Sequence, residues 1–125
     1  TRNFITLDVD MKQSNKVSLR FDQGDKYYLC SIEKENGETY MKIESPKETK
    51  HKVNSKLKIR YPSADGKYKI KLVVDNGIME FFVNALSASL AMDESPYNIS
   101  LLSDYTCSFS NVHINKLRSY ADCEF

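Results

Sequence analysis

Arginine and carboxylate side chains on predicted strands are the residues of this sequence best suited to chemistry. Arg20 and Asp22 lie on the non-core face of one predicted strand, Glu44 on a second strand and Glu80 on a third. Guanidinium and carboxylate groups each form two directed hydrogen bonds, which suits them to neighbouring sugar hydroxyl groups. The alternative is an exposed ladder of salt bridges on a solvated sheet face. The residue types are therefore compatible with two interpretations, a polar binding site or a solvated sheet face.

Glu80 differs from the other three in its immediate neighbours. Ile78 and Phe82 share its face of the strand, because side chains alternate along a strand. A carboxylate on an apolar face costs free energy unless a partner group satisfies it. We therefore expect a specific partner for Glu80.

Motifs of catalysis and of metal binding are missing from the sequence. No serine, cysteine or histidine is framed as a nucleophile with its base, and there is no nucleophile elbow, phosphate loop or zinc-protease helix. His51 and His113 have no companions at ligand spacing. We expect a protein that is not an enzyme and that uses no metal or cofactor.

Three cysteines, Cys30, Cys107 and Cys123, show no CxxC spacing. Cys30 and Cys107 fall in strand-like runs, which favours small buried apolar residues over a disulfide. The chain has eight tyrosines and no tryptophan. A flat tryptophan platform for sugar rings is thus excluded. Five tyrosines are candidates for stacking, although a structural role is the expected one for most of them: Tyr27, Tyr28, Tyr40, Tyr61 and Tyr97.

Composition indicates one compact domain that covers residues 1–125. Eighteen Lys and Arg residues balance seventeen Asp and Glu residues, for a net charge of +1. This balance argues against nucleic acid or an anionic membrane as the partner. No apolar run reaches the roughly twenty residues that a membrane-spanning helix needs.

Period-two alternation of apolar and polar residues predicts strands along almost the whole chain. The clearest signal is the hairpin whose arms, Lys67–Asp75 and Ile78–Asn84, flank Asn-Gly, a pair that tolerates positive φ. Residues 46–56 read as a long loop, and alternation resumes at Leu57, Ile59 and Tyr61. Thr106–Phe109 and Val112–Leu117 read as separate strands. The predicted fold is an all-β antiparallel sandwich of nine or ten strands, of the jelly-roll or concanavalin-like kind.

The hairpin also carries a resemblance to a known family. Asp75-x-x-x-x-Glu80-x-Phe82-Val83-Asn84 resembles the Val-Asp-x-Ser-Ser-Ile-Glu-Val-Phe-Val-Asn segment in the C-terminal β-sandwich of glycoside hydrolase family thirty-two, which contains invertases, levanases and inulinases. The family's paired serines are Gly77 and Ile78 here. Its catalytic propeller has no counterpart in this sequence. The resemblance therefore implies a sandwich without hydrolase activity.

A free-standing sandwich of this kind is similar to carbohydrate-binding module family sixty-six, whose members bind the terminal fructose of levan. The resemblance implies a small polar pocket, with Arg20, Glu44, Asp75 and Glu80 as the residues that bind fructan. It further implies an extracellular or cell-surface location and a place in a larger multidomain enzyme.

Two alternatives stay open. The sandwich is an accessory part of a fructan-processing hydrolase with no ligand of its own, in which case we expect an exposed apolar patch of a few hundred Å². Otherwise it is a laminin-G-like or lectin-like domain that binds a glycan or a protein, in some cases through calcium. Four aspartates offer oxygen ligands for that ion: Asp8, Asp10, Asp22 and Asp25.

Overall fold

The protein is described by a computed structural model that covers residues 2–46 and 54–117, and this part of the chain forms ten β-strands and no helix. None of it could therefore cross a membrane as a helix. The predicted antiparallel β-sandwich is confirmed. The strands are β1 (Arg2–Asp10), β2 (Lys16–Gln23), β3 (Lys26–Glu35), β4 (Glu38–Glu44), β5 (Asn54–Lys58), β6 (Lys67–Asp75), β7 (Ile78–Val83), β8 (Leu86–Ala91), β9 (Asn98–Ser103) and β10 (Ser108–Leu117).

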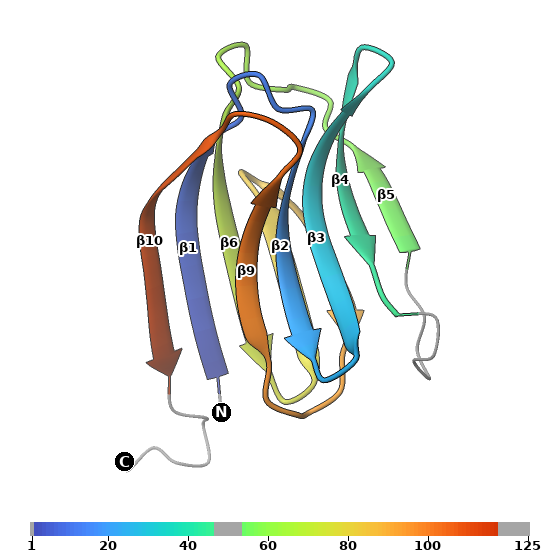
Figure 1. The fold of residues 1–125 in the computed structure, drawn as a ribbon, viewed down its shortest axis with the longest axis vertical. Coiled ribbons are helices and arrows are strands. Elements are labelled where there is room, and N and C mark those ends of the chain that lie inside the picture. The colour runs from blue at the N-terminus through green and yellow to red at the C-terminus, as the bar shows by residue number, and fades with distance from the viewer. Residues whose placement is uncertain (1, 47–53, 118–125) are drawn as a thin grey trace.

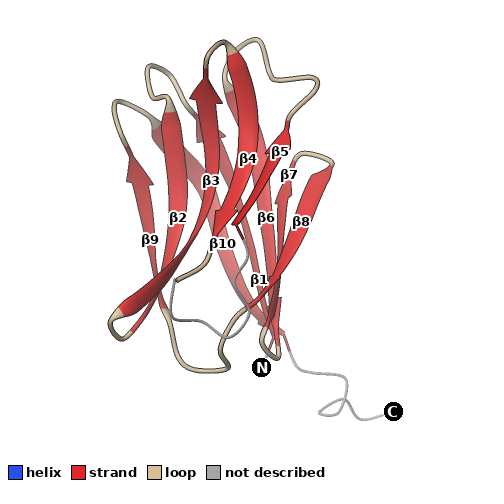
Figure 2. Cartoon of the chain, turned by 90° about the vertical axis from the view of Figure 1, so that its right-hand side faces the viewer, coloured by secondary structure: helices blue, strands red, loops and turns tan. Residues whose placement is uncertain are grey.

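The strands form two five-stranded sheets that pack face to face (Figures 1 and 2). Sheet A has the order β10-β1-β6-β7-β8, and sheet B has the order β5-β4-β3-β2-β9. Hairpins join most neighbours, but β1 is inserted between β6 and β10, and β9 pairs with β2. As a result β9 and β10 are edge strands on the same side of the sandwich (Figure 1).

The core lies between the sheets because alternate side chains of most strands are apolar. On β1, Ile5, Leu7 and Val9 are at most 2% exposed. Both sheets contribute large, completely buried side chains, among them Phe21 on β2 and Phe81 on β7. Burial of each such side chain contributes roughly 1.5–3 kcal/mol to the free energy of unfolding.

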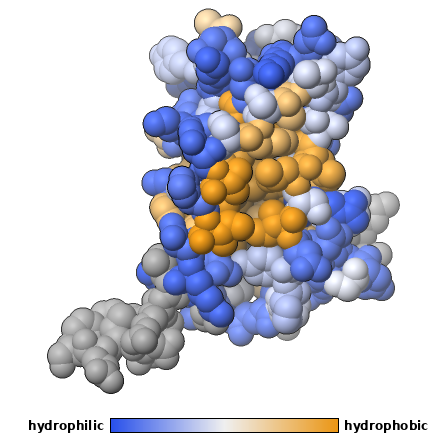
Figure 3. Space-filling view, turned by 60° about the vertical axis from the view of Figure 1, so that its left-hand side comes forward, coloured by the Kyte–Doolittle hydropathy of each residue, from blue (hydrophilic) through white to orange (hydrophobic). Residues whose placement is uncertain are grey.

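The side of the sandwich formed by β9 and β10 is an exception to this burial. Figure 3 shows apolar side chains gathered on the face of the molecule that includes this side. We call the exposed large apolar residues of the two strands the edge patch: Leu101 (37% exposed), Leu102 (42%), Val112 (45%) and Ile114 (61%).

Cys30 and Cys107 are free thiols, as predicted. Cys30 is completely buried, and its Sγ lies 4.0 Å from Sδ of Met79 across the core. Burial raises the pKa of the Cys30 thiol well above its ordinary value, so the thiol is protonated and unreactive. Cys107 is half-buried, and Cys123 lies outside the described residues.

Two strand predictions are wrong in their boundaries. β5 begins at Asn54, earlier than predicted, and Tyr61 lies outside the strand and is 91% exposed. The two strands predicted over Thr106–Leu117 are one strand, β10. The pairing of Thr6 with His113 and of Asp8 with Ser110 leaves two residues of β10 opposite one of β1. This is a β-bulge, and Asn111 adopts φ 51° within it.

The Asn76-Gly77 turn joins β6 to β7 as predicted. Asp75 pairs with Ile78, and the two turn residues have φ of 49° and 81°. Positive φ at both central residues matches the right-handed twist of the flanking strands. The turn also contacts the chain after β8, where the Met92 backbone N–H donates to the Gly77 carbonyl oxygen at 2.8 Å.

We predict that Gly77→Ala destabilises the protein more than Gly37→Ala. Both glycines follow asparagine in a hairpin turn and have similar φ, 81° and 78°. A Cβ at Gly77 would lie 3.0 Å from the Met92 carbonyl oxygen, whereas a Cβ at Gly37 meets nothing within 4 Å. Each change costs about 1 kcal/mol for the left-handed backbone, and only Gly77→Ala adds a clash. Urea unfolding of the two variants measures the difference, and equal midpoints would contradict this explanation.

Candidate functional site

The four residues predicted to bind fructan lie on opposite outer faces of the sandwich. Arg20 and Glu44 belong to sheet B, and Asp75 and Glu80 belong to sheet A. In every case the adjacent residues of the strand are buried in the core, so the side chain faces outward. The two sheets are separated by a core roughly 10 Å thick. The structure therefore does not bring the four residues into one pocket.

Glu80 does not need the partner that its apolar neighbours suggested. Its side chain is exposed, and Ile78 beside it is 55% exposed. The apolar face that carries Glu80 is thus the outer one, while Met79 and Phe81 supply the core face of β7. Because the carboxylate stays in contact with water, the expected cost of burying its charge does not arise.

Asp75 is engaged by Arg2 at the end of sheet A. Its Oδ2 accepts hydrogen bonds from Nη2 of Arg2 at 2.9 Å and from Nε at 3.1 Å. The two residues are direct cross-strand partners on β6 and β1. Both hydrogen bonds end on the same carboxylate oxygen, and this charge-assisted contact favours the observed pairing of the two strands, which gives Asp75 a structural role.

Arg20 and Glu44 do lie close together, in one cross-strand row of sheet B. Both pair with Leu29 of β3, Arg20 from β2 and Glu44 from β4. Their Cα atoms are therefore two strand spacings apart, about 10 Å. Leu29 is half-buried between them. Across the sheet, the row presents a guanidinium, then an apolar side chain, then a carboxylate.

The guanidinium of Arg20 is held by two neighbours. Nε donates to Oδ1 of Asp22 at 2.9 Å, and the central guanidinium carbon lies 4.0 Å from the centroid of the Tyr27 ring. Tyr27 is the partner of Asp22 across β2 and β3 and is 42% exposed. Because these two contacts already order the Arg20 side chain, it would lose little further conformational entropy on binding a ligand. Its terminal amino groups donate to no described residue.

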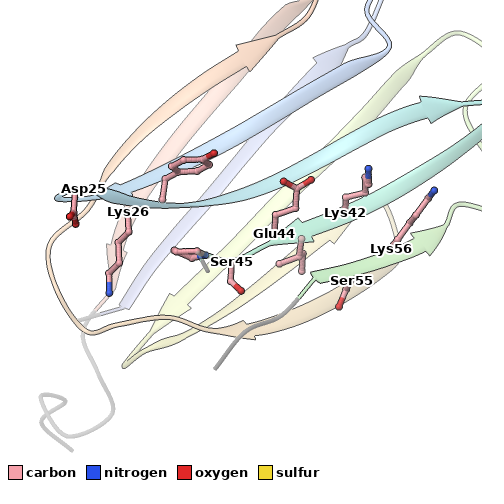
Figure 4. A pocket seen from close by; sticks show the side chains of 10 residues that line it. Asp25, Lys26, Lys42, Glu44, Ser45, Ser55 and Lys56 are labelled. Carbon is pink, nitrogen blue, oxygen red and sulfur yellow. The ribbon is translucent and has the colours of Figure 1, made fainter. Parts of the chain in front are cut away.

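A cavity of about 540 Å³ lies at the Glu44 end of this row, and Arg20 and Leu29 do not line it. Figure 4 shows Lys26 at one end of the cavity, Lys42 and Lys56 at the other, and Glu44 between them. Tyr27 also lines it. The cavity therefore combines an aromatic ring, a carboxylate and several ammonium groups on the outer face of sheet B.

Part of this outer face is the salt-bridge ladder named as the alternative. Nζ of Lys42 donates to Oε2 of Glu33 at 2.5 Å, and this hydrogen bond raises the pKa of Lys42. Lys56 donates to Glu35 at 2.9 Å. Glu44 is less tightly held, with Nζ of Lys16 at 3.7 Å from its Oε1. The lysines of β4 and β5 are thus committed to partners, whereas Glu44 retains acceptor capacity.

Tyr27 is the aromatic residue that the structure places at the candidate site. The other tyrosines singled out in the sequence serve elsewhere. Tyr28 is buried in the core, and Tyr97 packs edge-on against Phe21 with ring centroids 5.6 Å apart. Tyr40 lies under the ammonium of Lys56, 4.2 Å from the ring centroid. Alternation along Lys26–Glu35 separates Tyr27 from Tyr28, and this is the signal that could have singled out Tyr27.

No pattern in the sequence pointed to the buried serine pair at the centre of the same face. Ser18 and Ser31 pair across β2 and β3, their hydroxyl oxygens are 2.7 Å apart, and the residues are 4% and 1% exposed. They are buried although they lie on the outer side of the sheet, in a cross-strand row with Leu102 and Lys42. The pair fixes the two strands beneath the candidate site.

We predict that Ser31→Ala destabilises the protein by about 1–3 kcal/mol, because it leaves the buried Ser18 hydroxyl without its partner. The double variant Ser18→Ala/Ser31→Ala should lose less than the sum of the two single changes, since no unsatisfied hydroxyl is left. Urea unfolding of the three variants gives this coupling. Strict additivity would show that the hydrogen bond contributes nothing.

The aspartates considered as calcium ligands do not come together. Asp8 and Asp10 lie on the outer face of sheet A, where Asp8 accepts a hydrogen bond from Asn111 at 2.7 Å. Asp22 is bound to Arg20 on sheet B. Within residues 2–46 and 54–117, no group of three or more His, Cys, Asp or Glu side chains could hold a metal ion.

Comparison with known proteins supports the fold and leaves function open. No protein-family model and no curated protein matches the sequence. Among solved structures, the chain is similar to a protein from Saccharomyces cerevisiae described as functionally unknown, with a TM-score of 0.70 and 10% sequence identity. The similarity covers 94% of this chain and 71% of the yeast chain. At this identity the likeness shows the fold alone.

Proposed function

We propose that this protein is a non-catalytic carbohydrate-binding module whose site is the Arg20–Leu29–Glu44 row of sheet B. The observation that carries the proposal is the arginine held over Tyr27, 4.0 Å from the ring centroid, in the same cross-strand row as Glu44, whose carboxylate keeps acceptor capacity. Such a pair of planar groups offers both donors and acceptors to adjacent hydroxyl groups.

Each residue has a distinct role in the proposed complex. The terminal amino groups of Arg20 donate to sugar hydroxyl oxygens, and Glu44 accepts hydrogen bonds from sugar hydroxyl groups. Leu29, half-buried between them, contacts the apolar C–H surface of the ring. Asp22 positions Arg20 rather than contacting the sugar. A small, partly solvated site of this kind corresponds to Kd values from about 1 mM to 1 μM, or roughly −4 to −8 kcal/mol.

The resemblance of the β6–β7 hairpin makes terminal fructose of a levan or inulin chain the proposed ligand. Isothermal titration calorimetry with levan, inulin, sucrose and a non-fructan polysaccharide tests the proposal. We expect heat with levan and competition by short fructo-oligosaccharides. A folded sample that gives no heat with any fructan would exclude the fructan assignment, and no heat with any glycan would exclude the function as a whole.

An accessory sandwich with no ligand of its own is the second candidate, and one observation favours it. The edge patch is the kind of exposed apolar surface expected of a module that packs against another protein surface. The patch lies along β9 and β10, whereas the proposed sugar site lies on β2, β3 and β4. The two surfaces can therefore be tested separately.

A further inference from the structure

The edge patch marks an opening in the sandwich. Leu101 is the cross-strand partner of the buried Leu19, and Ile114 is the partner of the buried Ile5, so both exposed side chains are on the core-facing side of their strands. They are nevertheless 37% and 61% exposed. Residues 2–46 and 54–117 therefore leave the core uncovered between the edge strands β9 and β10, and an apolar surface would be needed to close it.

Among the strands that the structure describes, none pairs with the backbone of β9 along this edge. The Asp104 N–H donates to the Lys16 carbonyl oxygen at 3.1 Å, continuing the ladder between β2 and β9. In an antiparallel ladder every second residue is bonded to the neighbouring strand. The N–H groups of the intervening residues therefore face the open edge: Ile99, Leu101 and Ser103.

β9 lacks the features that normally prevent an edge strand from pairing with another chain. Its sequence, Asn-Ile-Ser-Leu-Leu-Ser, contains no charge, proline or glycine. The opposite edge of sheet B, β5, carries Lys56 and Lys58, and β10 is interrupted by the bulge at Asn111. Lysines and bulges of this kind are standard protection for edges.

β8, the other uncharged edge strand, has no comparable apolar surface. Leu90 is only 3% exposed, and Leu86 is half-buried. A free edge and exposed leucines therefore coincide at β9, where Leu101 and Leu102 are 37% and 42% exposed. We propose that β9 pairs antiparallel with β9 of a second copy of this chain, across a two-fold axis.

A second copy is the partner that the chemistry of this strand favours. An interface built on one strand and its symmetry mate brings each side chain against the same set of residues. Because β9 carries no charge, the pairing creates no like-charge contact within the strand. In the register that centres on Leu101, the two leucines meet on the core-facing side and Ile99 lies opposite Ser103. The two open sides then face each other, so that Val112 and Ile114 are covered as well.

Sedimentation equilibrium over a range of concentrations tests this dimer. We expect the wild type to reach twice the chain mass of 14.4 kDa. Leu101→Lys should weaken association roughly 30-fold or more, since it places two ammonium groups at the centre of an apolar interface. Leu57→Lys is the matched control, because Leu57 has nearly the same exposure, 38%, on the opposite edge strand β5. This variant should associate like the wild type.

Three outcomes would overturn the proposal: a wild type that stays monomeric at every concentration, a Leu101→Lys protein that still forms dimers, or equal loss in the two variants. Hydrogen exchange of the wild type makes the test independent of how well the variants fold. The amides of Ile99, Leu101 and Ser103 should be protected at high concentration and should exchange faster on dilution. Protection that does not depend on concentration would show that another part of the chain covers the edge.

Discussion

Arg20→Ala is expected to reduce fructan binding by a factor of roughly 30 or more, which takes a weak complex out of the range of calorimetry. The change removes a guanidinium that donates at least one charge-assisted hydrogen bond to the sugar, and such bonds are worth about 1.5–3 kcal/mol each. It also frees Tyr27, whose ring lies 4.0 Å from the guanidinium carbon. Arg20→Lys keeps the charge but not the planar fork, so we expect it to bind poorly as well.

Glu80→Ala is the matched control for this prediction. Glu80 is an exposed charged residue on the outer face of sheet A, and its removal should leave fructan affinity and stability nearly unchanged. Thermal unfolding of both variants separates loss of binding from loss of fold. If Glu80→Ala abolished binding while Arg20→Ala preserved it, the site would have to lie on sheet A.

Phe81→Ala is expected to give the largest loss of stability, about 3–5 kcal/mol. Phe81 is completely buried on the core-facing side of β7, so its removal leaves a cavity that the two sheets cannot fill without moving. This is a large share of the roughly 5–15 kcal/mol by which a domain of this size is stable. Urea unfolding monitored by circular dichroism measures the loss.

Phe82→Ala, one residue along, provides the comparison. Phe82 is half-buried on the outer face, beneath the ammonium of Lys71, which lies 5.2 Å from the ring centroid. We expect it to lose no more than about half as much as Phe81→Ala, because less apolar surface is buried and no closed cavity forms. Equal losses would mean that the two faces of β7 are buried to a similar degree.

Local sequence signals predicted most of the strands and turns, because these elements depend on residues that are close together in the sequence. The Asn76-Gly77 turn and the alternation of Met79, Phe81 and Val83 each depend on neighbours within a few residues. The bulge at Asn111 was missed, since it exists only relative to the partner strand β1. The insertion of β1 between β6 and β10 likewise depends on contacts between residues far apart in the sequence.

The candidate site also depends on contacts between residues far apart in the sequence, which local signals do not predict. Alternation correctly predicted that Arg20, Glu44 and Glu80 face away from the core. Alternation could not show to which sheet each strand belongs. In a sandwich, the sheet assignment determines whether two outward-facing side chains are neighbours or lie on opposite faces of the molecule. The burial of Ser18 and Ser31 was hidden for a related reason, because the residues that flank the pair in its cross-strand row, Leu102 and Lys42, come from other strands of the sheet.

The most direct test of the proposed sugar site is an NMR titration of the ¹⁵N-labelled protein with a levan oligosaccharide. The largest amide shift changes should cluster on β2, β3 and β4 around Arg20, Leu29 and Glu44, which share one row of sheet B. Residues of β6 and β7 on the opposite face should be unaffected. Shift changes centred on Glu80, or a spectrum that does not respond at any concentration of the oligosaccharide, would contradict the proposal.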